Sequence, residues 1–190
     1  SCQYMVDAVS NLFYGMPING YVALNMNAVA MINDAVGGVT VTVPEDMTQV
    51  DPSFAEGAAV TLTGDQALKF TRYRDTEKDF SNNSRMERQK QYLVNFMGQA
   101  VKAMKADMGL PVSLYQSLTD DMVTNLSLDR SVYLATEAID MHFTADGIVS
   151  LKAKSKKGSV YDEVYVDDDA LYDLIIQTFY TEEQSEGESK

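Results

Sequence analysis

The sequence has a single cysteine, no long apolar run and little positive charge. The lone Cys2 excludes an intrachain disulfide and any metal site built from several cysteines. No stretch of about eighteen apolar residues is present, and no charged-then-apolar leader opens the chain, so the sequence as written predicts neither a membrane span nor a signal peptide. We therefore expect any membrane anchor to lie upstream of this sequence.

Positive charge is scarce because 15 lysines and arginines stand against 28 aspartates and glutamates, which gives a formal net charge of -13. Binding to a nucleic-acid backbone needs clustered positive charge over a broad face, so no nucleic-acid partner is expected. The 190-residue length and the 45% hydrophobic content fit a single globular domain, expected over residues 1–180. Residues 181–190 are acidic and polar, and they predict a disordered tail.

Most of the arginines are concentrated in one part of this acidic chain. Four of the five lie between positions 72 and 88, namely Arg72, Arg74, Arg85 and Arg88. A guanidinium group suits bidentate contact with phosphate or carboxylate, so the cluster predicts an anion-binding site. The alternative is a structural ion-pair network, which the spacing does not distinguish from a binding site. The candidate acidic partners of Arg85 and Arg88 in that network are Asp65, Asp75, Glu77 and Asp79.

The second half of the arginine cluster predicts the start of a helix. Ser84 and Glu87 stand in the S-x-x-E relation of a capping box, so the helix is expected to begin at Arg85. Arg85 and Arg88 then lie about one turn apart on the same face, with Gln89 nearly beside them. Cationic side chains in a first turn oppose the helix dipole, and a bound anion would compensate this unfavourable term.

Apolar periodicity predicts helices and strands in alternation over the rest of the chain. Helical spacing begins near Cys2, near Ala28, near Thr63 and at position 84. Gly37 and Gly38 are expected to end the second of these helices through backbone turns. A buried strand is expected from Tyr21, and alternating valines predict another strand over 39–43.

The C-terminal third predicts a hairpin followed by a helix. Asp146 and Gly147 stand between two alternating segments, which predicts a β-hairpin from Ala138 to Ser155. The acidic run Asp167–Asp169 precedes an apolar helical pattern, and a helix cap is favoured over a metal site there. These elements together predict an α/β fold with a mixed central β-sheet and helices packed on its faces.

The motifs and their order resemble those of the LytR-CpsA-Psr family. The string YVALNMNAVAMINDAVGGVTVTVPEDM starts at Tyr21, and G-x-x-x-x-L-x-G-x-Q-A-L-x-F-x-R-x-R follows from Gly57 to Arg74. The motif R-x-x-R-Q then occupies Arg85 to Gln89. The resemblance covers about residues 2–104 and implies that family's fold, truncated at the N-terminus.

The resemblance implies a phosphotransferase at the extracytoplasmic face of the Gram-positive cell membrane. Such an enzyme moves a teichoic acid or capsular polysaccharide from a polyprenyl pyrophosphate carrier to peptidoglycan and forms a phosphodiester. By that resemblance the phosphates would be bound, and the transfer assisted, by the residues Arg72, Arg74, Arg85 and Gln89, with Arg88 as a further member. Asp79 is expected to orient an arginine or to assist a metal.

A magnesium ion is also implied by the resemblance, together with a tunnel for the lipid. The Asp-rich stretch that supplies magnesium ligands in known members precedes the point where this sequence starts, so the ligands are expected to be missing from this chain. The apolar faces of 28–36 and 93–104 are the candidates to line the tunnel, although for any single residue there plain core packing is the favoured interpretation. Without the family's first strands a sheet edge would be exposed, so we expect a homodimer.

Two functions therefore stay open. One is the phosphotransferase, and the other is a non-catalytic module that binds a pyrophosphate lipid or an anionic glycan but performs no transfer without the metal. Members of the family have also been called transcriptional attenuators, and the charge of -13 argues against that role here.

Overall fold

The computed structural model describes residues 2–75, 81–159 and 162–180. They divide into two compact units, one formed by Gln3–Ile18 with the chain from Val149 onward, and the other by Asn19–Ile148. The predicted single domain over 1–180 stays a prediction, and the predicted tail at 181–190 lies outside the described residues.

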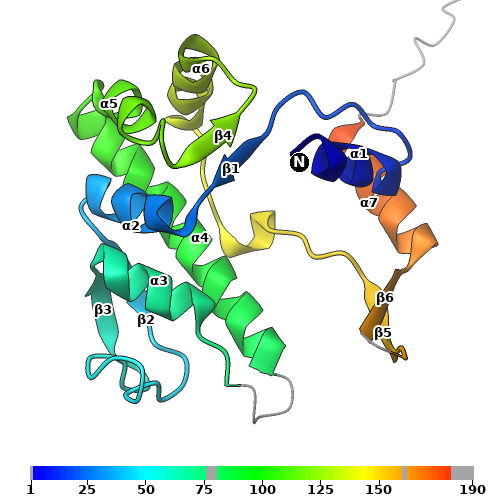
Figure 1. Ribbon diagram of the computed structural model, residues 1–190, viewed down its shortest axis with the longest axis horizontal. Coiled ribbons are helices and arrows are strands. Elements are labelled where there is room, and N and C mark those ends of the chain that lie inside the picture. The colour runs from blue at the N-terminus through cyan, green and yellow to red at the C-terminus, as the bar shows by residue number, and fades with distance from the viewer. Residues whose placement is uncertain (1, 76–80, 160–161, 181–190) are drawn as a thin grey trace, which may run out of the picture. The chain divides into compact units, whose positions relative to one another are not determined.

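The larger unit contains most of the helices and two pairs of strands (Figure 1). Its elements, in chain order, are β1 (Val22–Leu24), α2 (Met26–Ala35), β2 (Val39–Thr42), β3 (Ala59–Leu62), α3 (Gly64–Arg72), α4 (Ser81–Ala106), α5 (Leu110–Ser117), β4 (Met122–Thr124), α6 (Leu128–Ala138) and the 3-10 turn η1 (Ala145–Gly147). Helix α4 is the longest, and β2 and α3 both pack against it.

The core of this unit lies under the β2–β3 ladder. Val39 and Val41 of β2 are buried while the threonines between and after them are exposed, as the alternation of the sequence predicted. The antiparallel ladder pairs Val39 with Leu62, which is buried on the same side. Phe54 and Phe70 pack edge to face with ring centroids 5.8 Å apart, so the β2–β3 connection and α3 share this core.

Polar contacts of two adjacent residues join α2 to β3, α3 and α4. Asn33 is fully buried, and its Nδ2 donates to the Leu62 carbonyl at 2.8 Å. Its Oδ1 accepts from the Tyr92 hydroxyl at 3.2 Å, while Asp34 accepts from the Gly64 amide at 2.7 Å. Burial, and secondarily the charge of Asp34, raises the pKa of Tyr92 to about 12.

The smaller unit consists of α1 (Cys2–Leu12), β5 (Ala153–Lys157), β6 (Asp162–Val166) and α7 (Asp168–Phe179). Asp167 accepts from the Ala170 amide at 3.1 Å, which confirms the acidic run as a helix cap. Leu171 and Ile175 are the buried residues of α7.

The α/β class is confirmed, and the strands pair as three separate two-stranded antiparallel sheets, in the orders β1-β4, β2-β3 and β5-β6. Each described strand is three to five residues long and has one neighbour, in place of the mixed central sheet expected from the sequence. The strand expected from Tyr21 exists as β1, but all three of its residues are exposed.

The predicted hairpin over Ala138–Ser155 is wrong. Helix α6 ends at Ala138, and Asp146 and Gly147 lie in a 3-10 turn in which the Gly147 amide donates to the Thr144 carbonyl. Gly147 is not among the glycines with positive φ, which a type I′ hairpin turn requires. The hairpin is instead formed by β5 and β6, directly before α7.

Candidate functional site

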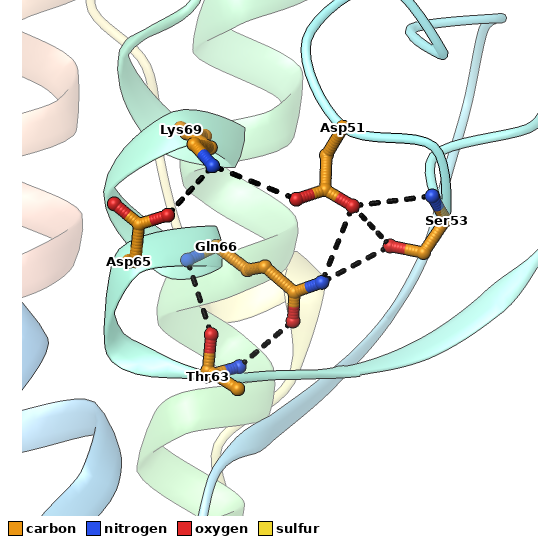
Figure 2. A network of polar contacts seen from close by, with 6 residues as sticks. All are labelled: Asp51, Ser53, Thr63, Asp65, Gln66 and Lys69. Carbon is orange, nitrogen blue, oxygen red and sulfur yellow. Dashed lines mark hydrogen bonds and ion pairs between the residues drawn. The ribbon is translucent and has the colours of Figure 1, made fainter.

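Helix α3 carries the first arginine of the cluster and is fixed at its start by reciprocal bonds (Figure 2). Thr63 Oγ1 accepts from the main-chain amide of Gln66 at 3.4 Å, and Gln66 Oε1 accepts from the main-chain amide of Thr63 at 3.1 Å. Gln66 Nε2 also donates to Asp51 at 3.3 Å and to Ser53 at 3.1 Å. This capping box therefore ties the N-terminus of α3 to the β2–β3 connection.

The only lysine of α3 is held by carboxylates of the same network (Figure 2). Lys69 Nζ lies 2.6 Å from Asp65 and 3.6 Å from Asp51. Two hydrogen bonds from Ser53 lower the pKa of Asp51, with smaller contributions from Gln66 and Lys69. The charge of Lys69 is thus balanced within the network.

The first two predicted arginines lie where α3 ends. Arg72 is the last residue of α3 and is exposed, and Arg74 is exposed two positions later. Tyr73 between them leaves the helix with φ -52° and ψ 135°. Cations at a helix C-terminus are favourable to its dipole, so these two guanidinium groups are compatible with the helix end they occupy.

Arg85 lies in the second turn of α4, because α4 begins at Ser81. The predicted helix start at Arg85 is therefore wrong, and Ser84 is inside the helix. Arg85 Nη2 donates to Asn82 Oδ1 at 2.7 Å. Arg85 Nε is buried and has no hydrogen-bond partner among the residues that the structure describes. A buried donor without an acceptor is unfavourable, and an anion is one acceptor that would satisfy it.

Arg88 is almost completely buried, with 1% of its surface exposed. Its Nε donates to the Phe70 carbonyl at 3.0 Å, its Nη2 donates to the Tyr73 carbonyl, and its Nη1 lies 2.5 Å from Glu45 Oε1. Burial lowers the pKa of Arg88 while Glu45 opposes that change. Sequence reasoning missed Glu45, since a partner 43 positions away leaves no periodic signal.

Gln89, like Arg88, connects the two arginine motifs. Its Nε2 donates to the Thr71 carbonyl at 3.0 Å. Three carbonyls at the end of α3 therefore accept from two consecutive side chains of α4. The R-x-x-R-Q motif meets the R-x-R motif at this contact, although the predicted role of each residue toward phosphate stays a prediction. Asp79 lies outside the described residues.

A metal site is not formed by the part of the chain that the structure describes. No three histidine, cysteine, aspartate or glutamate side chains gather there as ligands. The magnesium ion implied by the resemblance therefore stays a prediction. Among the described helices, none is long and apolar enough to cross a membrane.

Three cavities lie along α4 in the order of its sequence. The first, of about 360 Å³, has a mixed lining that includes Arg88, Lys90, Gln91 and Val94. The second, of about 330 Å³, is lined by Leu93, Met97 and the lone His142. The third, of about 220 Å³, is apolar and is bounded by residues of β1, α2, α4, α5, β4 and α6, including Val36, Phe96, Ala100 and Met104. Both segments expected to line a lipid tunnel contribute to the third cavity.

Comparison with known families agrees with the motifs. The model of the LytR_cpsA_psr family matches residues 2–176. This chain belongs to the LytR_cpsA_psr family. The match extends well beyond the region of 2–104 in which the sequence motifs were recognised, and it includes most of α7.

Curated relatives of this LytR_cpsA_psr chain bear the name polyisoprenyl-teichoic acid--peptidoglycan teichoic acid transferase TagU. The protein from Bacillus cereus is 46% identical over 83 residues, which are 43% of this chain and 27% of the relative. The protein from Halalkalibacterium halodurans is 31% identical over 129 residues, 67% of this chain and 40% of the relative. The matched part of this chain thus spans less than half the length of either relative.

Solved structures of similar proteins confirm the family fold. B. subtilis TagV superposes with a TM-score of 0.70 at 23% identity, over 95% of this chain and 71% of that structure. B. subtilis TagU superposes with a TM-score of 0.61 at 24% identity, over 92% of this chain and 69% of that structure. A structure of TagT bound to LI-WTA gives a TM-score of 0.67 at 18% identity, over 90% of this chain and 63% of that structure.

Proposed function

We propose that this chain is the pyrophosphate-binding part of a cell-envelope transferase. The reaction would move a glycopolymer of teichoic-acid type from a polyprenyl pyrophosphate carrier to peptidoglycan, at the extracytoplasmic face of the membrane. The names of the TagU relatives support this glycopolymer and this acceptor. Arg72, Arg74, Arg85 and Gln89 are the residues to which we assign the phosphates.

The observation that carries the proposal is the contact between the end of α3 and the second turn of α4. Arg88 and Gln89 donate to the main chain around Arg72, so the guanidinium groups of two motifs are held on adjoining helix ends. The buried Nε of Arg85 adds a donor that has no acceptor among the described residues. Guanidinium donors from two neighbouring motifs, one of them with a buried Nε, are suited to a group that carries several anionic oxygens.

The chemistry would be a displacement at phosphorus. A hydroxyl of the peptidoglycan acceptor would form a new P–O bond to the phosphorus that bears the glycan, and the bond to the bridging oxygen of the pyrophosphate would break. The hydroxyl proton would be lost, and the lipid would leave as polyprenyl phosphate. Phosphoryl transfer depends mainly on positioning and on stabilising charge on the phosphate oxygens, which is work that arginines can do.

The cavities along α4 support a lipid as the carrier. Arg85 and Phe96 are eleven positions apart, which corresponds to roughly 16 Å along a helix. A ligand with its phosphates at Arg85 and an apolar chain directed along α4 would reach the apolar cavity at Phe96, Ala100 and Met104. That arrangement matches an amphipathic carrier better than a free anionic sugar.

A second candidate is a binding module that holds the pyrophosphate lipid without transferring the glycan. The observation in its favour is that the described residues gather no set of metal ligands. Both candidates require the same arginines for binding, so they differ in turnover and not in affinity.

The binding of a pyrophosphate tests what the two candidates share. Calorimetric titration with farnesyl pyrophosphate should show binding, and Arg85→Ala should weaken it by about 1.5–3 kcal/mol, the scale of a charge-assisted contact. Thermal stability should fall by no more than about 1 kcal/mol, because the variant loses the local bond from Nη2 to Asn82 but Nε has no acceptor to lose within the described structure. Arg130→Ala is the matched control, since Arg130 is exposed on α6 and its loss makes the same charge change. Equal affinities in wild type and Arg85→Ala would reject Arg85 as a phosphate ligand.

A further inference from the structure

We propose that Arg88, paired with Glu45, is a positioning residue that fixes the Arg72–Arg74 segment and does not itself contact the phosphates. The inference rests on the proposed function for its ligand, but it concerns a different group of atoms. Arg88 stands in the same motif as Arg85 and three positions from it, and the resemblance placed Arg85 at the phosphates with Arg88 as a further member. Their surroundings in the structure differ.

The guanidinium group of Arg88 is already engaged on each of its nitrogens. Nε and Nη2 donate to the carbonyls of Phe70 and Tyr73, and Nη1 is paired with Glu45 at 2.5 Å. These partners lie on α3, at its C-cap and in the segment after β2. A planar fork of donors can serve three acceptors in one plane, which a lysine ammonium cannot do. Arg88 therefore joins three segments of the larger unit through one side chain.

Tyr73, the residue between Arg72 and Arg74, is held at three points. Its carbonyl accepts from Arg88, and its amide donates to the Lys69 carbonyl at 3.0 Å. Its hydroxyl accepts from Gln49 Nε2 at 3.0 Å. Fixing the backbone of Tyr73 limits where the side chains on either side of it can project. The two exposed arginines thus depend on a buried third one for their position.

Direct contact between Arg88 and phosphate is disfavoured by burial and by charge. With 1% of its surface exposed, Arg88 offers an anion almost no accessible donor. The Glu45 carboxylate beside it balances the positive charge and would repel an anion that approached the same nitrogens. The Glu45 side chain is 36% exposed, so it can be replaced without opening the core.

Direct phosphate binding by Arg88 and positioning by Arg88 predict opposite changes in affinity when the Glu45 carboxylate is removed. If Arg88 bound phosphate directly, Glu45→Ala would release its guanidinium and remove a negative charge, and farnesyl pyrophosphate would bind more tightly. If Arg88 positions the segment, the same variant should bind roughly tenfold more weakly although the protein is less acidic, because a small displacement of binding groups is costly. Glu56→Ala is the control, since Glu56 is an exposed carboxylate of the same β2–β3 connection and should leave the affinity within about twofold.

Arg88→Lys provides the second variant and keeps the charge at position 88. We expect about the same tenfold loss of affinity as for Glu45→Ala, and little further loss when the two changes are combined, because both disrupt one contact. A purely structural role would lower the melting temperature while the folded protein kept its affinity. An affinity unchanged in both variants would therefore overturn the proposal, as would tighter binding by Glu45→Ala.

Amide hydrogen exchange tests the positioning without any ligand. The Tyr73 amide should exchange about tenfold faster in Glu45→Ala and Arg88→Lys than in wild type, while the amides of the β2–β3 ladder keep their rates. Unchanged exchange at Tyr73 would overturn the proposal. If wild type fails to bind farnesyl pyrophosphate, the proposed function fails, and the exchange rates at Tyr73 still decide whether Arg88 fixes this segment.

Discussion

The hydroxyl of Tyr92 is a residue-scale feature whose effect can be measured. It donates to Asn33 and is partly buried, and this burial raises the pKa of Tyr92 to about 12. An unfolded chain would ionise this tyrosine near its ordinary value of 10.0. Between those values the unfolded state loses the proton before the folded state does, so the contribution of Tyr92 to stability is complete below 10.0 and is lost as the pH rises toward about 12.

We expect Tyr92→Phe to remove this part of the pH dependence. The variant should be less stable than wild type by about 1 kcal/mol near neutral pH, because Asn33 loses a hydrogen-bond donor. Its stability should fall less steeply than that of wild type above pH 10.0. Urea unfolding at several alkaline pH values measures both quantities, and Tyr4→Phe, at an exposed position, is the control. Parallel curves for wild type and Tyr92→Phe would contradict this prediction.

At the scale of elements, the start of α3 depends on the network around Asp51. Hydrogen bonds from Ser53, then the contacts with Gln66 and Lys69, lower the pKa of Asp51 below its ordinary value of 3.8. The ionised form is therefore favoured in the folded protein. Its contribution to stability is complete well above 3.8 and is lost as the pH falls through the lowered pKa of the folded state.

Asp51→Asn should therefore cost about 1 kcal/mol of stability near neutral pH and progressively less in acid. The measurement is the difference in the free energy of unfolding between wild type and variant, followed from about pH 6 down to about pH 2. Glu56→Gln changes an exposed carboxylate of the same connection and should show no comparable trend. A difference that stays constant with pH would mean that the charge of Asp51 contributes nothing.

Local signals predicted those elements that local chemistry specifies. The helix start near Thr63, the Asp167 cap and the alternating valines of β2 all lie where the sequence placed them, and Gly37 and Gly38 have the positive φ values expected of a turn. The predictions that failed rest on local patterns that also occur inside a longer element. Ser84 and Glu87 match a capping box, but the helix already runs through them from Ser81.

Long-range pairing explains what the sequence did not reveal. Strand β4 is three residues long and pairs with β1 about one hundred positions earlier. Neither the length of the segment nor a turn motif beside it therefore indicates a strand there. The arginine cluster itself was predictable, because its composition stands out in an acidic chain. The different surroundings of Arg85 and Arg88 were not predictable, since those of Arg88 depend on Glu45 and on carbonyls of α3 and its C-cap.

At the scale of the whole molecule, the acidic surface and the arginine cluster act in opposite directions on an anionic ligand. The net charge of -13 repels it, so binding depends on contacts at the cluster. The described residues gather no metal ligands, and we therefore expect the affinity for farnesyl pyrophosphate to persist in EDTA. Titrations in magnesium and in EDTA measure this directly. An affinity lost in EDTA would contradict the expectation and would require metal ligands from outside the described residues.

The homodimer expected from the sequence also belongs to this scale and stays a prediction. The described structure exposes many large apolar side chains, for example Tyr4, Met5 and Tyr133. Light scattering of the purified chain at several concentrations measures the oligomeric state.

The bonds that Arg88 makes have a consequence for how the family can vary. Two of its three partners are main-chain carbonyls, at Phe70 and Tyr73, which every amino acid provides. Substitution of those two side chains would leave the acceptors in place, whereas the third partner is the carboxylate of Glu45. Across homologues, positions 45 and 88 should therefore change together. Position 70 should vary independently of position 88, whereas position 73 should not, because Arg88 Cζ also lies over the Tyr73 ring, 5.8 Å from its centroid.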